Sequence, residues 1–146
     1  FAIGEEEYGV EVSQVKTIER MVPMTRVPKT PPFIKGVINL RGIVIPTMDL
    51  RKRFDLEERA YDEETRIIIV SVQDMEVGLI VDSANDVIEI EEQQIEDPPE
   101  VVGGIRAKYL RGVAKLNERL LVMLNLEEVL NKEEIVQLEA FGEQTR

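Results

Sequence analysis

Cysteine and histidine are both absent from the 146 residues of this chain. Without cysteine there is no disulfide framework and no thiolate chemistry, and a reducing cytoplasm is compatible with the composition. Without histidine, a Ser-His-Asp or Cys-His catalytic arrangement is excluded, and so is a phosphoacceptor histidine. A zinc site would have to rely on carboxylates alone, which such sites seldom do. We therefore expect no metal and no cofactor.

Long apolar runs and an excess of positive charge are also lacking. No stretch approaches the roughly 18 apolar residues that a transmembrane helix needs, so we expect no direct membrane insertion. No signal peptide is visible in a chain that begins at Phe1. The net charge of −11 argues against nucleic acid and anionic membranes as partners, and it would attract basic protein surfaces.

One stretch, residues 33–50, predicts a β-hairpin. Two apolar runs rich in β-branched residues flank the dipeptide Arg41-Gly42, and a glycine can adopt a positive φ without a Cβ clash. Asn39 and Arg41 are the polar exceptions in or beside this apolar element. Such groups must be hydrogen-bonded, solvated or used by a partner.

The two halves of the chain resemble each other. Residues 33–50 align with residues 109–126 without a gap, so that Gly36 meets Gly112 and the cap Asp49 meets Asn125. Upstream, residues 7–12 align with residues 76–81. Each half offers about five short strands separated by turn signals, and such strands close most readily into a small barrel. The repeat therefore predicts two β-barrel subdomains that share an apolar seam.

The fold class that we predict is all-β with short helices. Approximate boundaries are residues 13–64 for the first subdomain and 65–124 for the second, with strands exchanged between the halves. Helices are expected within residues 125–141, and a further strand within residues 86–90. Ser13 is expected to begin a short helical segment that turns Val15 and Ile18 inward.

Catalysis is the weaker functional hypothesis. Asp49, Asp82 and Asp86 fit turn or cap positions better than an acid/base pair, and residues 102–105 lack the pattern of a phosphate-binding loop. Small barrels instead offer strand edges, to which an extended peptide can add as a further strand, and grooves, which can bind a helix of a partner. Arg41 can be a solvated turn residue or a charged anchor beside an apolar groove. For Val15, Ile18 and Val87 a core position is the simpler interpretation.

The chain resembles the CheW family of chemotaxis coupling proteins. The hairpin residues 33–42, followed by Ile45-Pro46 and residues 49–51, look like that family's signature. The likeness extends over residues 8–10, Val15 and Ile18, residues 77–82 and 86–87, and residues 109–112 to the closing helices. It implies two five-stranded SH3-like barrels within a single CheW-like domain.

The resemblance also implies a non-catalytic adaptor in the cytoplasm, associated with membrane-bound receptor arrays. It would join the cytoplasmic tip of methyl-accepting chemotaxis proteins to the regulatory domain of the histidine kinase CheA. Carried over by position, the receptor groove and coupling residues are Val15, Gly36, Asn39, Arg41, Val87 and Gly112. Residues that face the kinase stay unassigned. A CheW-like domain from CheV or CheA, or a general peptide-binding module, are the alternatives.

Overall fold

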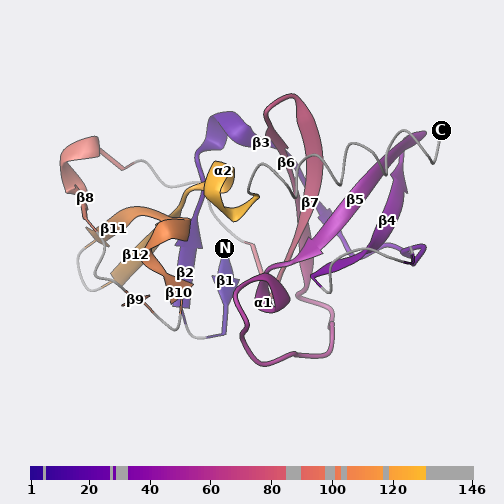
Figure 1. Cartoon of the computed structure of the whole chain (residues 1–146), viewed down its shortest axis with the longest axis horizontal. Coiled ribbons are helices and arrows are strands. Elements are labelled where there is room, and N and C mark those ends of the chain that lie inside the picture. Colours follow the sequence, from indigo (N-terminus) through magenta and orange to yellow (C-terminus); the bar gives the residue numbers. More distant parts are fainter. Residues whose placement is uncertain are drawn as a thin grey trace.

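The computed structural model describes residues 1–4, 6–26, 28, 33–84, 90–97, 101–102, 105–116 and 119–130. Strands dominate this part of the chain, and its helices are single turns (Figure 1). The strands are β1 (Ala2–Ile3), β2 (Glu6–Gly9), β3 (Val15–Arg20), β4 (Ile34–Leu40), β5 (Ile43–Asp49), β6 (Arg66–Val72), β7 (Met75–Val81), β8 (Ile95–Glu96), β9 (Val101–Val102), β10 (Ile105–Arg106), β11 (Leu110–Leu116) and β12 (Arg119–Leu124). The helices are η1 (Val12–Gln14), α1 (Leu50–Arg53), η2 (Glu92–Gln94), η3 (Ala107–Tyr109) and α2 (Leu126–Val129).

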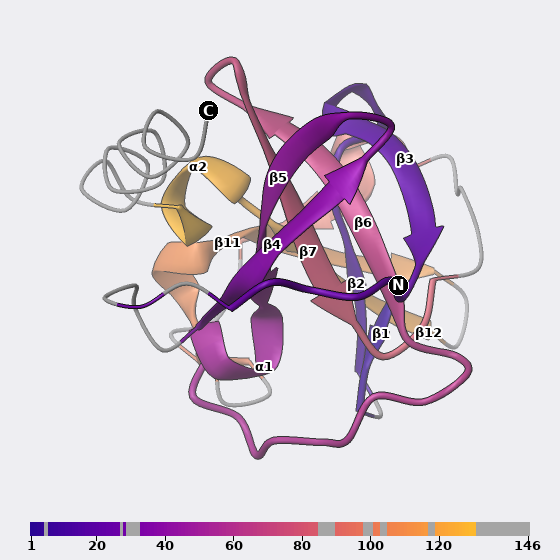
Figure 2. The same cartoon turned by 90° about the vertical axis from the view of Figure 1, so that its right-hand side faces the viewer.

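Two five-stranded sheets form the body of the molecule. Barrel 1 has the strand order β3-β6-β7-β5-β4, and barrel 2 has the order β1-β2-β12-β11-β8. They stand side by side, with barrel 1 on the right of Figure 1 and seen face-on in Figure 2. Thr25, which follows β3, exchanges two backbone hydrogen bonds of 2.9 Å with Val37 of β4, so the sheet closes on itself. The predicted all-β fold class is confirmed.

The internal repeat is visible in the strand registers. In β4–β5, Ile34 pairs with Met48, and the register then shifts by a bulge so that Gly36 pairs with Thr47. The hairpin β11–β12 repeats this arrangement with the equivalent residues, including the bulge after Leu110. A parallel strand then joins each hairpin, β7 beside β5 and β2 beside β12. The sequence repeat is therefore a structural repeat.

The division expected at residue 64 does not coincide with the sheets. β6 and β7 lie beyond that boundary, yet they pair with β3 and β5 and complete barrel 1. β1 and β2, at the start of the chain, instead lie in barrel 2. The reason is that the repeat unit is permuted: the strand equivalent to β7 precedes rather than follows its hairpin, so the N-terminal strands complete the distant barrel.

The core explains why several strands are apolar at successive positions. In β6, Ile67 and Ile69 point into barrel 1, while Ile68 and Val70 face the seam shared with barrel 2. All four side chains are buried. A strand that is buried on both faces loses the polar alternation of a surface strand. The seam is the largest apolar cluster among the described residues. It also includes residues of the helices α1 and α2, among them Leu50 and Leu126.

The segment after Ser13 is a correction to the sequence interpretation. Val15 and Ile18 belong to a strand, β3, and only residues 12–14 form a turn of 3-10 helix. A register shift between Val15 and Thr17 inserts one residue, so positions three apart fall on the same face of the strand. That spacing imitates a helical period. Ile18 is also half exposed rather than turned inward.

Both predicted helix caps are confirmed. The carboxylate of Asp49 accepts hydrogen bonds from the backbone N–H groups of Arg51 and Lys52 at the start of α1. The side chain of Asn125 accepts one from Glu127 N–H in α2. The predicted strand over residues 86–90 and the helix beyond residue 130 lie almost wholly outside the described residues, and so does Val87.

Candidate functional site

A groove of about 710 Å³ runs between the two barrels. One wall comes from barrel 1, where β3 contributes Val15 and Ile18 and β6 contributes Ile68. The other wall comes from barrel 2, where β2 contributes Tyr8 and β12 contributes Leu121. Neither barrel could form this groove alone, so its shape depends on how the two barrels are held together.

Apolar side chains remain accessible along the groove. Val12 is 60% exposed and Ile18 is 49% exposed, although both are branched aliphatic residues. The bulge in β3 places Ile18 opposite Ile68, on the groove face of the strand. Exposed apolar groups that line a concave surface from two elements are typical of a protein-binding site.

Two ion pairs border the apolar surface on the side of barrel 2. Arg119 Nε lies 3.1 Å from Glu7 Oε1, which joins β12 to β2. Arg111 of β11 pairs with Glu11. All four residues line the groove. The hydrogen bond from Arg119 lowers the pKa of Glu7, so this pair remains charged at neutral pH. Deeper in the groove, burial raises the pKa of Tyr8 to about 12, which keeps its phenol neutral.

The hairpin tip between β4 and β5 holds Asn39 and Arg41. Arg41 and Gly42 have φ values of 54° and 86°, as a two-residue turn with two positive φ angles requires. Asn39 Oδ1 accepts a hydrogen bond of 2.9 Å from Gly42 N–H, so this side chain stabilises the turn. Arg41 has a side chain that is 72% exposed, and its Nη2 lies 3.5 Å from Glu19 Oε1 of β3.

Gly36 and Gly112 lie at close approaches between neighbouring strands. A Cβ on Gly36, whose φ is 153°, would lie 2.4 Å from the carbonyl oxygen of Thr25. A Cβ on Gly112 would lie 2.4 Å from Ile95 Cγ2 and 2.7 Å from the carbonyl oxygen of Glu96. Both glycines thus allow the backbone of an edge segment to pack against the hairpin.

The structure separates the predicted site residues into three places. Of those that it describes, only Val15 lines the groove. Asn39 and Arg41 share the hairpin tip beside β3, and Gly36 and Gly112 face the outer edges of the two hairpins. Sequence reasoning missed the border pairs Glu7–Arg119 and Glu11–Arg111, because their partners lie about a hundred positions apart in the chain.

Within the described residues no three carboxylates gather closely enough to hold a metal ion. No helix among them is long and apolar enough to cross a membrane.

Comparison with known proteins gives a consistent result. The profile of the CheW-like domain family matches residues 1–134. Chemotaxis protein CheW of Bacillus subtilis is 47% identical over 91% of this chain and 85% of its own length. The CheW of Klebsiella aerogenes is 38% identical over 92% and 81% of the two chains. The crystal structure of scaffolding protein TtCheW from Thermoanaerobacter tengcongensis superposes with a TM-score of 0.83, at 38% identity over 92% and 86% of the two chains. The chain belongs to the family of CheW-like domains.

Proposed function

We propose that this chain is a non-catalytic adaptor of chemotaxis signalling that joins methyl-accepting chemoreceptors to the histidine kinase CheA. The observation that carries the proposal is the groove between the barrels, where apolar residues of both barrels meet over about 710 Å³. A groove of this kind accepts the apolar face of an amphipathic helix. The tip of the receptor's helical hairpin would lie there. The names of the relatives, chemotaxis protein CheW and scaffolding protein TtCheW, point to the same role.

Charged groups around the groove would orient the receptor. Val15 and Ile18 line the groove, and the next residue of β3, Glu19, is paired with Arg41. The exposed guanidinium of Arg41 could turn toward an acidic or carbonyl group on a partner, because an ion pair at 3.5 Å with one solvent-exposed side chain contributes little stability. Val15 and Arg41 would thus contact the receptor, the first through apolar burial and the second through charge.

The kinase would bind at the barrel tips. Val44 and Leu120 occupy equivalent positions in the two hairpins and are 44% and 43% exposed. Ile43 beside the first tip is 55% exposed. The resemblance implies that the regulatory domain of CheA is itself CheW-like, so apolar tips of this kind would suit contacts between a barrel of this chain and a barrel of the kinase.

An enzymatic role is the weaker candidate. General acid or base catalysis at neutral pH favours a carboxyl group whose pKa is raised by burial. The carboxyl groups of Glu7 and Asp82 instead have lowered pKa values, each beside an arginine. That direction is typical of structural ion pairs.

Binding of a purified receptor fragment tests the groove assignment. We expect Val15→Glu to weaken this binding by at least about tenfold, because a buried charge opposes burial of the apolar helix face. Lys16→Glu is the matched control, since it places the same carboxylate at the adjacent exposed position of the same strand. Equal binding by wild type, Val15→Glu and Lys16→Glu would rule out the groove as the receptor site. Binding of unrelated extended peptides with equal affinity would favour a general peptide-binding module.

A further inference from the structure

The short helix α1 lies where the two barrels meet, and Arg53 is its last residue. The guanidinium carbon of Arg53 lies 4.8 Å from the centroid of the Phe33 ring and 4.9 Å from that of the Tyr109 ring. Phe33 directly precedes β4 of barrel 1, and Tyr109 directly precedes β11 of barrel 2. A guanidinium within about 6 Å of an aromatic face is held by a cation–π interaction. Arg53 therefore binds one ring from each barrel.

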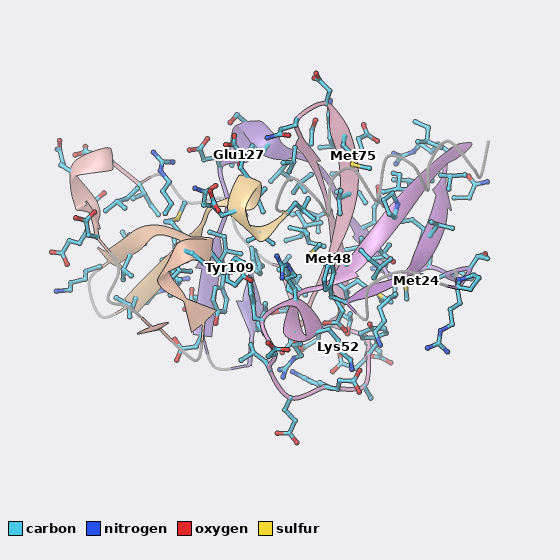
Figure 3. The ribbon with its side chains drawn as sticks, in the orientation of Figure 1. Met24, Met48, Lys52, Met75, Tyr109 and Glu127 are labelled. Atoms are coloured by element: carbon cyan, nitrogen blue, oxygen red, sulfur yellow. The ribbon has the colours of Figure 1, made fainter. Side chains whose placement is uncertain are left out.

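These contacts occur between equivalent positions of the repeat. Phe33 and Tyr109 align with each other, and so do Arg53 and Val129. Arg53 Nε donates a hydrogen bond of 2.7 Å to the carbonyl oxygen of Val129, which is the last residue of α2. Tyr109 also contacts Phe54, and the centroids of the two rings lie 5.5 Å apart. Figure 3 labels Tyr109, which lies where the two sheets meet. One side chain thus connects the two copies of the repeat through three groups.

A second connection begins two residues earlier on the same helix. Arg51 Nε lies 3.0 Å from Asp82 Oδ1, and its Nη2 lies 2.5 Å from Oδ2. Asp82 follows β7 of barrel 1, and the same carboxylate accepts a 2.7 Å hydrogen bond from Gly4 N–H in the turn between β1 and β2 of barrel 2. Helix α1 therefore reaches barrel 2 in two directions, through Arg51 toward Gly4 and through Arg53 toward Val129.

We propose that Arg53 is a positioning residue that fixes the orientation of barrel 1 relative to barrel 2 and thereby sets the shape of the groove. Arg53 does not line the groove itself, so it would act through the two barrels that do. Its planar fork can lie against two rings while Nε donates to Val129, whereas a lysine has a point charge and no equivalent of Nε. The expected effect of Arg53 on receptor binding rests on the proposed function, whereas its expected effect on the orientation of the two barrels does not.

The orientation can be measured directly, because the chain has no native cysteine. Spin labels on Val44→Cys and Leu120→Cys would report the distance between the two barrel tips, both of which are exposed. We expect Arg53→Met to broaden or shift this distance distribution, since methionine keeps an apolar stem but removes the charge and the donor. Arg53→Lys should restore it only in part. Arg66→Ala is the matched control, because within the described residues the side chain of Arg66 donates its hydrogen bonds to the carbonyl oxygens of Glu63 and Thr65, which are near it in the chain.

Receptor binding provides the functional measurement. Arg53→Met should bind the receptor fragment about fivefold more weakly than wild type and Arg66→Ala, at a temperature where all three proteins are folded. Tyr109→Leu, which removes one ring, should change the distance distribution in the same direction. Unchanged distributions in folded Arg53→Met and Tyr109→Leu would overturn the proposal. If wild type fails to bind the receptor, the proposed function fails, whereas the distance measurement still decides the role of Arg53.

Discussion

Gly36 and Gly112 occupy the same position in their two hairpins, one opposite Thr47 and the other opposite Met123. In each case a Cβ would lie 2.4 Å from an atom of the neighbouring edge segment.

We expect Gly36→Ala and Gly112→Ala each to lower the free energy of unfolding by about 1–3 kcal/mol, which denaturant titration would measure. Gly36→Ala should cost more, because its nearest clash is with a backbone oxygen rather than a side-chain methyl group and its φ is positive. Gly42→Ala is a useful comparison, since no atom lies within 4 Å of a Cβ there and its cost comes from the positive φ alone. Full stability with lost receptor binding would instead assign these glycines to the interface.

Arg41 combines an exposed charge with a strained backbone conformation. Its φ of 54° is a conformation that asparagine adopts more readily than arginine. Arg41→Asn is expected to raise the free energy of unfolding by up to about 1 kcal/mol while it weakens receptor binding. Urea denaturation and a binding titration on the same protein would test both effects. A variant that is less stable and binds normally would show that Arg41 serves the turn rather than the partner.

Two threonines of barrel 1, each with a buried hydroxyl group, differ in their hydrogen bonds. Within the described chain, Thr17 Oγ1 is buried and has no hydrogen-bond partner. Thr47 Oγ1 donates a 3.0 Å hydrogen bond to the carbonyl oxygen of Gly36. Thr17→Val is therefore expected to stabilise the protein by about 1 kcal/mol, and Thr47→Val to destabilise it by about 1–2 kcal/mol. Thermal unfolding of the two variants would show a higher midpoint temperature for Thr17→Val and a lower one for Thr47→Val than for wild type. Equal shifts of the midpoint in the same direction would contradict this prediction.

The ion pair at Asp82 predicts the response of stability to acid. Burial alone would raise the pKa of Asp82, but hydrogen bonds from Arg51 and from Gly4 N–H, with the charges of Arg51 and Arg59, lower it below the ordinary pKa of an aspartate. A carboxyl group with a lower pKa in the folded state stabilises the protein above its unfolded pKa, and this stabilisation is lost as the pH falls through the folded pKa. Asp82→Asn should therefore be less stable than wild type at neutral pH.

The difference in free energy of unfolding between wild type and Asp82→Asn should narrow below about pH 4, where the carboxyl group of Asp82 becomes protonated. Urea denaturation at a series of pH values measures this gap. Asp62→Asn is a suitable control, since the pKa of Asp62 is also lowered but its contacts lie within one loop of barrel 1. A gap for Asp82→Asn that stays constant down to acidic pH would contradict the assigned role of the ion pair.

Local and repeated features of the fold could be predicted from the sequence. Residues 41–42 fix the first hairpin, Asp49 and Asn125 fix two helix starts, and the alignment of Gly36 with Gly112 predicted equivalent hairpins. These features depend on short-range chemistry, which the sequence displays directly. The equivalent pairing registers of the two hairpins show that the repeat also carries information about packing.

Features that depend on long-range contacts were missed. The bulge in β3 made Val15 and Ile18 imitate a helix, because one inserted residue changes the apparent period from two to three. The alignment of residues 7–12 with residues 76–81 indicated an exchange of strands, but it did not show which barrel β2 joins. The groove needs residues of both barrels, and the hydrogen bond from Arg53 to Val129 joins residues 76 positions apart in the chain.

The central claim is that this chain joins receptor to kinase, and co-sedimentation tests it most directly. Purified CheA would be mixed with receptor fragments, with and without this protein, and the kinase in the receptor pellet would be measured. We expect the kinase to sediment when wild type is present and to decrease severalfold with folded Arg41→Glu, while Lys115→Glu, an exposed change in the other hairpin, retains it. An amount of sedimented kinase that is the same with and without wild-type protein would contradict the account.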